Sequence, residues 1–169
     1  LVNFVGECLV HRKNLKPSLT LGVFLLALFL YQIFYWWDMW ELKNLLRSGG
    51  INFLIFARLL LIPLSLFCAT ALLCPALKFP ANGEKLSLTD HFYEHSRPVY
   101  VIWLAICLIA MSQAADIRSE GWASTEIYIR LAAALLFGIG LFIRNHLFNL
   151  ILGIVLLSML IGYIVISIA

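Results

Sequence analysis

The stretch Phe34-Tyr35-Trp36-Trp37-Asp38-Met39-Trp40-Glu41-Leu42 ends a long apolar run with a block of aromatic and acidic residues. Tryptophan and tyrosine collect at the edge of a bilayer, because the ring prefers the apolar side and its N–H or O–H prefers water. The preceding run, residues 21–35, contains no charged residue. We therefore interpret this stretch as the point where a membrane-spanning helix reaches the membrane surface.

The composition supports a membrane protein. Of the 169 residues, 63% are hydrophobic and 12% are charged, whereas soluble domains have roughly 45–50% and 25%. The net charge of +3 is dispersed along the chain, and the absence of a basic cluster argues against nucleic acid as a partner. We expect the lipid bilayer as one partner and either another protein or a second copy of the chain as another.

Apolar runs, prolines and glycines divide the chain into five predicted spans, at residues 18–40, 51–74, 99–115, 126–143 and 147–169. Only Arg144, Asn145 and His146 separate the last two, which predicts an antiparallel hairpin. Residues 1–10 resemble the end of a helix whose start is absent. The predicted fold is all-α: one integral membrane helical bundle, residues 1–169, with five full transmembrane helices and a truncated N-terminal helix.

Two features interrupt this pattern. Pro63, inside the second span, should kink the helix and leave the carbonyl near Leu59 without its usual donor. Residues 75–97 form a polar segment that we expect to lie on the membrane surface as a loop followed by a short helix. Ser87 or Thr89 would cap this helix, which would end where Pro98 leads into the third span.

The distribution of lysine and arginine predicts the orientation. Seven of these residues lie on one side of the predicted bundle: Arg12, Lys13, Lys16, Lys78, Lys85, Arg97 and Arg144. Three lie on the other side: Lys43, Arg47 and Arg118. Because cytoplasmic loops carry more positive charge, segment 75–97 should be cytoplasmic and the C-terminus non-cytoplasmic. We expect the bacterial inner membrane.

Arg58 and Arg130 are the only basic residues predicted inside spans, where an ionisable group is costly and usually faces the bundle interior. We expect both in the outer leaflet, level with carboxylates: Asp38, Glu41, Asp116 and Glu126. This candidate polar site would bind an anion or a lipid head group. The alternative is structural, with Arg130 paired to Glu126 and Arg58 paired or extended to the interface. The expected interfacial aromatics are Trp36, Trp37, Trp40 and Trp122.

Residues 91–95 match the zinc-protease pattern H-x-x-E-H through His91, Glu94 and His95. The match covers five residues, and the acids expected to complete such a site lie on the other side of the membrane. We therefore expect a wetted surface helix and no metal. No phosphate-binding loop or nucleophile motif is visible, so the sequence predicts no catalytic residue and no cofactor.

Several of these residues together resemble a family of small bacterial multi-pass membrane proteins of uncharacterised function. They are Trp36-Trp37-x-x-Trp40 at the end of a span, a second span bounded by Pro75, and Leu88-Thr89-Asp90-His91-Phe92-Tyr93 with Arg97 before the third. The resemblance covers roughly residues 6–97 and implies the same topology, with a helix before the first basic turn. It implies no activity.

Two functions follow as expectations. The first is a non-enzymatic membrane subunit or scaffold that binds a lipid or a protein partner. The alternative is a small transporter or channel for an anionic solute, which would use Arg58, Arg130 and the facing carboxylates. Arg58, Ser65 and Ala69 share one face of the second predicted span. Transport would require a continuous polar cavity along this face, whereas in a scaffold Ser65 and Ala69 would pack against another helix.

Overall fold

The computed structural model describes residues 1–49, 53–74, 85–117 and 125–168, except for the side chains of residues 38, 40–49, 114–117, 125–126 and 166–168. Within these ranges the chain is almost entirely helical. The elements in order are α1 (Val2–Val10), η1 (Arg12–Asn14), β1 (Leu15–Lys16), α2 (Leu19–Gly49), α3 (Phe53–Leu73), β2 (Leu86–Ser87), α4 (Leu88–Ile117), α5 (Thr125–Gly140) and α6 (His146–Ile168).

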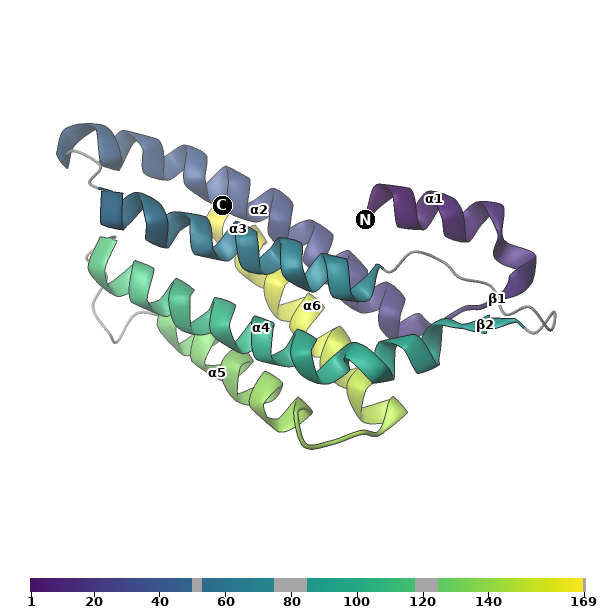
Figure 1. Cartoon of the computed structure of the whole chain (residues 1–169). Helices are drawn as coiled ribbons and strands as arrows, with labels where there is room; N and C mark the ends of the chain where they lie inside the picture. Colours follow the sequence, from purple (N-terminus) through teal and green to yellow (C-terminus); the bar gives the residue numbers. More distant parts are fainter. Residues whose placement is uncertain (50–52, 75–84, 118–124, 169) are drawn as a thin grey trace.

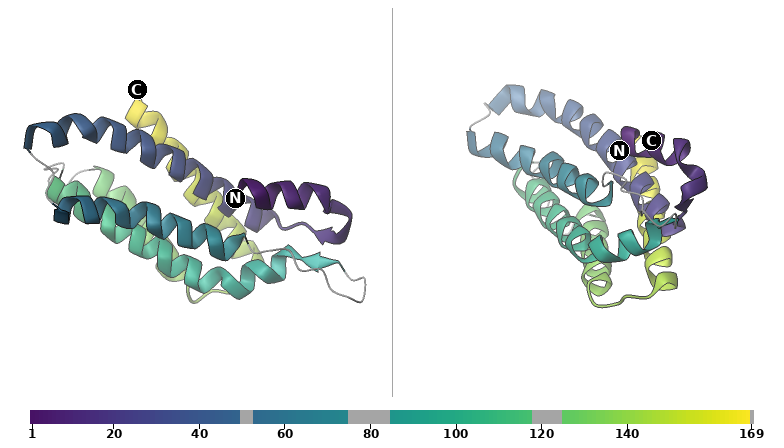
Figure 2. Two further views of the ribbon diagram at one scale, coloured as in Figure 1. Left: turned by 45° about the horizontal axis from the view of Figure 1, so that its top comes forward. Right: turned by 45° about the vertical axis from the view of Figure 1, so that its right-hand side comes forward.

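The long helices form an elongated bundle (Figures 1 and 2). Helix α4 packs closely between α3 and α5, while α6 crosses to lie mainly against α2. Strands β1 and β2 pair in parallel, with Leu15 opposite Leu86 and Lys16 opposite Ser87. This two-residue ladder, which was not predicted, ties the start of α2 to the start of α4.

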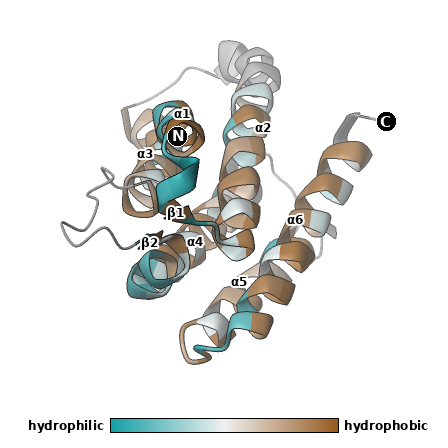
Figure 3. Cartoon of the chain, turned by 90° about the vertical axis from the view of Figure 1, so that its right-hand side faces the viewer, coloured by the Kyte–Doolittle hydropathy of each residue, from teal (hydrophilic) through white to brown (hydrophobic). Residues whose placement is uncertain are grey.

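Four helices in the described part of the chain are long and apolar enough to cross a membrane: Leu19–Trp37, Phe53–Leu73, Leu88–Gln113 and His146–Val165. Their sides are predominantly hydrophobic, whereas hydrophilic segments gather at the end that carries α1, β1 and β2 (Figure 3). The all-α fold is confirmed, and the helices are compatible with an integral membrane protein. The apolar part of α5, Ile127–Gly140, is shorter than these four.

The first predicted span required correction at its end. Helix α2 does not stop at Trp40 but continues to Gly49. Leucine, glutamate, lysine and arginine follow the aromatic block, and these residues have high helix propensity, so the helix continues until glycine. The aromatic block and the helix end therefore lie at different places in α2.

The predicted break at Pro98 was also wrong. Residues 88–117 form one helix, α4, in which Pro98 lies ten residues after the first. Buried side chains recur at helical spacing on both sides of the proline, at Leu88, Phe92, Val99 and Tyr100. An interior proline costs about 3 kcal/mol, and each large buried side chain contributes about 1.5–3 kcal/mol. Packing therefore outweighs the proline, and the predicted surface helix is the first part of α4.

The predicted hairpin of the last two spans was wrong in its packing. Helix α5 ends at Gly140, three residues early, and α6 contacts α2 much more than α5. A glycine permits the close approach of α6 to α2: a Cβ on Gly153 of α6 would lie 3.0 Å from Phe24 Cε2 of α2. At Gly140, the end of α5, a Cβ would lie 3.0 Å from Leu152 Cδ2 of α6, so α5 and α6 approach closely there.

Local predictions about helix caps and the carbonyl freed by Pro63 were more accurate. The Ser18 and Ser87 hydroxyls accept hydrogen bonds from the Leu21 and Asp90 amides, at 3.3 and 3.2 Å, and so cap α2 and α4. The Leu59 carbonyl, which Pro63 deprives of a backbone donor, accepts a hydrogen bond from the Tyr35 hydroxyl. Helix α2 therefore supplies the bond that α3 lacks.

Candidate functional site

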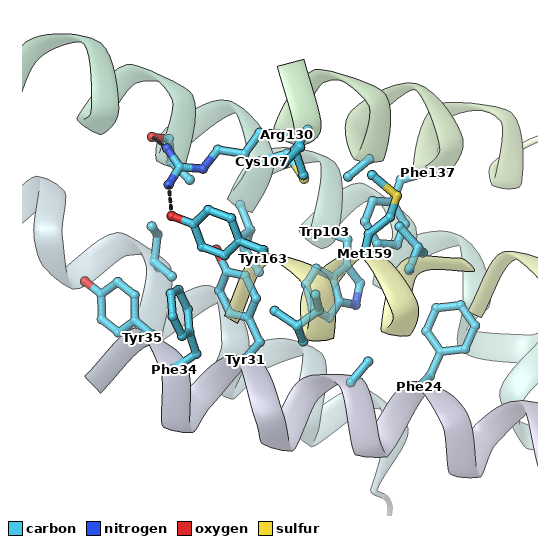
Figure 4. A pocket seen from close by; sticks show the side chains of 18 of the residues that line it. Phe24, Tyr31, Phe34, Tyr35, Trp103, Cys107, Arg130, Phe137, Met159 and Tyr163 are labelled. Atoms are coloured by element: carbon cyan, nitrogen blue, oxygen red, sulfur yellow. Dashed lines mark hydrogen bonds between the residues drawn. The ribbon is translucent and has the colours of Figure 1, made fainter. Parts of the chain in front are cut away.

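A cavity of about 120 Å³ lies inside the bundle among α2, α4, α5 and α6 (Figure 4). It occurs where α5 and α6 diverge, because α6 packs mainly against α2. Side chains line the space between these helices. The residues that line it are mainly aromatic and aliphatic: Phe24, Ala27, Tyr31, Phe34, Tyr35, Ile62, Trp103, Ile106, Cys107, Ala110, Gln113, Ile129, Arg130, Ala133, Phe137, Gly153, Leu156, Met159, Leu160 and Tyr163.

Aromatic side chains from four helices hold the walls in place. Trp103 of α4 stacks on Phe137 of α5, with ring centroids 5.2 Å apart and planes 11° apart, and Tyr31 of α2 meets the indole edge-on at 5.5 Å. Phe34 of α2 meets Tyr163 of α6 edge-on at 5.1 Å. Each such pair contributes about 0.5–1.5 kcal/mol beyond its buried area. The cavity is therefore bounded by mutually supporting rings.

One end of the cavity is polar because Arg130 reaches it from α5. Its Nη1 donates to the Ala110 carbonyl at 3.0 Å and its Nη2 to the Tyr163 hydroxyl at 3.3 Å. The guanidinium carbon lies 5.9 Å from the centroid of the Tyr163 ring, a distance suited to a cation–π interaction. These contacts hold the charge beside the cavity, and no acidic side chain is among its described lining residues.

Trp103 contributes a second donor. Its side chain is 6% exposed, and its indole Nε1 has no hydrogen-bond partner among the described residues. A buried donor without a partner costs about 1–3 kcal/mol, so native proteins usually satisfy one with protein, water or a ligand. The arrangement can therefore accept an apolar molecule that carries hydrogen-bond acceptors.

Arg58 lies in different surroundings. It is half-buried at the contact of α3 with α4, where its Nη2 donates to Ser112 Oγ at 3.1 Å and to the Ser112 carbonyl at 3.4 Å. The Gln113 amide donates back to the Arg58 carbonyl at 2.7 Å. Both arginines therefore bind the same stretch of α4, residues 110–113, but only Arg130 lines the cavity.

The predicted carboxylate partners cannot be compared with these contacts. The side chains of Asp38, Glu41, Asp116 and Glu126 lie outside the described residues. The same holds for the side chain of Trp40 and for Trp122. Trp36 and Trp37 are described, and at 69% and 52% exposed they point away from the bundle, as expected for interfacial tryptophans.

The structure gathers the residues of the H-x-x-E-H match on one face of α4. One potential ligand atom from each of His91, Glu94 and His95 lies within 4.8 Å of the others. The centroids of the His91 and His95 rings are 4.4 Å apart. The cluster lies near the start of α4, at the hydrophilic end of the bundle, whereas Arg130 of α5 contacts Ala110 further along α4.

Sequence reasoning found Arg130 but missed the rest of the cavity. Tyr31, Trp103, Phe137 and Tyr163 come from four helices that are distant in sequence. Their only sequence signal is the placement of aromatic residues, three of them with a polar atom, well inside apolar spans. Such residues are more often ordinary core residues, so that signal alone does not predict a cavity.

Comparisons with protein-family models, curated proteins and solved structures find no match for this chain. The resemblance to a family of bacterial membrane proteins therefore stays a prediction.

Proposed function

We propose that this chain is a non-enzymatic membrane protein that binds a lipid or lipid-like amphiphile in the cavity beside Arg130. The observation that carries the proposal is the buried indole N–H of Trp103, which has no described partner inside an apolar cavity that also has a guanidinium at one end. An acceptor oxygen on the ligand would satisfy this donor, and the apolar body would contact the aromatic walls.

The chemistry of the cavity limits the ligand class. Arg130 favours a phosphate, carboxylate or carbonyl oxygen, because a guanidinium donates several hydrogen bonds and carries a permanent charge. A cavity of about 150 Å³ lined by apolar side chains accepts a benzene-sized molecule. The observed 120 Å³ therefore suits one ring or a short stretch of acyl or isoprenoid chain. The remainder of the ligand would extend between helices towards the bilayer.

Transport of an anionic solute has less support. A transport path would need polar side chains on both sides of the arginine, whereas the described lining is mostly apolar. The positions predicted to line such a path do not form a polar channel either. Ala69 is fully buried, whereas Ser65 is only half-buried and its hydroxyl donates to the Leu61 carbonyl of its own helix at 2.7 Å.

The topology is part of the proposal. We place the basic end of the bundle, with α1, β1 and β2, in the cytoplasm of a bacterium and the C-terminus on the outer side of its inner membrane. The excess of lysine and arginine in the connections at that end supports this orientation. Helix α5, with 16 residues, would extend only about 24 Å at 1.5 Å per residue. We propose it as a fifth, short crossing in a locally thinned bilayer.

The proposal is tested by mass spectrometry of molecules that copurify with the chain in mild detergent, normalised to the lipids of the source membrane. We expect one lipid class to be enriched in the wild type and depleted in Arg130→Gln, since glutamine can keep the bond to the Ala110 carbonyl but loses the charge. Arg144→Gln is the matched control, because Arg144 is exposed in the connection between α5 and α6. A wild-type profile equal to that of the bulk membrane would refute the proposal.

A second pair of variants tests the location of the ligand without changing charge. Ala133→Phe places a ring in the cavity, whereas Ala132→Phe places one on the exposed face of the same helix. We expect the first variant to exclude the ligand and the second to retain it. Equal retention by both variants would place the ligand elsewhere.

A further inference from the structure

We propose that His91, Glu94 and His95 bind a divalent transition-metal ion such as Zn²⁺ at the hydrophilic end of α4. The three residues occupy positions i, i+3 and i+4 of one helix, which places them on the same face. One potential ligand atom from each already lies within 4.8 Å of the other two. Two imidazoles and a carboxylate are a donor set that zinc uses in proteins.

The histidines are held by their other ring nitrogens. His91 Nε2 lies 3.2 Å from the Leu72 carbonyl of α3, and His95 Nδ1 lies 3.1 Å from the His91 carbonyl. Because a carbonyl can only accept, each of these nitrogens must carry the proton. The lone pair of the neutral ring therefore lies on Nδ1 of His91 and on Nε2 of His95.

This arrangement is the one that metal sites use to orient their ligands. A metal-binding histidine almost always donates its second ring N–H to a carboxylate, a backbone carbonyl or water, which fixes the tautomer and raises the basicity of the ligating nitrogen. In this chain both histidines have such a carbonyl partner. The Leu72 carbonyl is one of the last four of α3, so it also lacks a described partner within its own helix.

The cluster lies at the surface of the bundle. Glu94 is exposed, while His91 and His95 are half-buried. Three protein ligands on one helix leave a fourth position open to water or to a group from another molecule. Binding would also link the end of α3 to α4, because the His91 ring that would ligate the ion also donates a hydrogen bond to the Leu72 carbonyl.

The test measures zinc bound to the full, tag-free chain in detergent after removal of metals with a chelator. We expect one Zn²⁺ per chain by equilibrium dialysis and elemental analysis. Affinity should fall by more than about tenfold in His95→Gln and in Glu94→Gln, since loss of an outer partner alone lowers affinity about 10–100-fold. Glu94→Gln changes an exposed side chain, so its fold should be unaffected.

His11→Gln and Glu7→Gln are the matched controls, because both residues are exposed and lie in or next to α1, at the same end of the bundle as the cluster (Figure 3). Both controls should bind one equivalent of zinc with wild-type affinity. Substoichiometric binding by the wild type, or equal affinity in the Glu94, His95 and control variants, would overturn the proposal.

Discussion

The two arginines inside the bundle have the same chemistry and contact the same stretch of α4, yet their surroundings differ. Arg58 lies where α3 packs along α4, and its guanidinium donates to Ser112 in that contact. Arg130 lies where α5 and α6 diverge, and it lines a cavity. The packing of the neighbouring helices, rather than the residue type, therefore decides which buried charge can meet a ligand.

The two regions also differ in how they satisfy polar groups. On the α2–α3 side, Tyr35 bonds the Leu59 carbonyl, and the Gln32 amide donates to Thr70 Oγ1 at 3.2 Å. On the cavity side, the indole N–H of Trp103 has no described partner. An unpaired buried donor is destabilising, so a ligand acceptor at this position would stabilise the cavity side.

The largest effect should come from separating α6 from α2, which form one side of the cavity. In Gly153→Leu the added Cβ meets Phe24 and Val23 at 3.0 and 3.1 Å, so we expect a loss of about 1–3 kcal/mol from overpacking. Unfolding in mixtures of detergent and SDS, followed by circular dichroism, measures this change. Gly162→Leu is the control because a Cβ there meets nothing within 4 Å. Equal losses in both variants would show that the close contact at Gly153 does not set the packing.

The next test separates the roles of the two arginines. Arg58→Gln should lower the free energy of unfolding by about 1–2 kcal/mol, because it removes charged hydrogen bonds to Ser112. Lipid retention should stay at the wild-type level, in contrast to Arg130→Gln. The two variants are compared in the same detergent by unfolding and by lipid analysis. If Arg58→Gln also loses the lipid, the two arginines belong to one site.

A smaller effect should come from the bond that compensates for Pro63. Tyr35→Phe should cost about 1 kcal/mol in the wild-type background, because the Leu59 carbonyl would lose its donor. In Pro63→Ala the backbone N–H of residue 63 can bond that carbonyl, so the same substitution should cost close to nothing. A double-mutant cycle measures the coupling. Additive effects would mean that Tyr35 stabilises the chain in another way.

The smallest effect on stability should come from Trp103→Phe. It removes an unpaired buried donor while keeping an aromatic ring against Phe137, so we expect less than about 1 kcal/mol of change without ligand. Ligand affinity should fall about fivefold, the equivalent of about 1 kcal/mol for one hydrogen bond. Lipid titration followed by fluorescence measures this affinity. Trp37→Phe, on an exposed tryptophan, is the control. Unchanged affinity in Trp103→Phe would remove the indole N–H from the site.

Several predictions of helix ends and interactions succeeded because the relevant interactions are local. The Ser18 and Ser87 caps depend on residues three apart in sequence. The orphaned Leu59 carbonyl was predictable from Pro63 alone. Its partner, Tyr35, was not predictable because it comes from another helix.

Predictions failed where distant contacts outweighed local preference. Pro98 should end a helix by its own chemistry, but the buried side chains on both sides of it keep α4 continuous. The short connection after α5 suggested a hairpin, yet α6 packs better against α2 through Gly153. The separate surface helix expected around the H-x-x-E-H match is instead the first part of α4, and the Leu72 carbonyl that contacts His91 belongs to α3.

The sequence by itself determined that this chain is an all-α protein with helices apolar enough to cross a membrane, because apolar length is a property of each segment alone. It also identified Arg58 and Arg130 as the charges inside those segments. Only the tertiary structure decided that Arg130 lines a cavity, whereas Arg58 lies in the packed contact between α3 and α4. That distinction depends on where α6 lies, and its position results from side-chain packing between segments more than a hundred residues apart, such as Phe24 and Gly153.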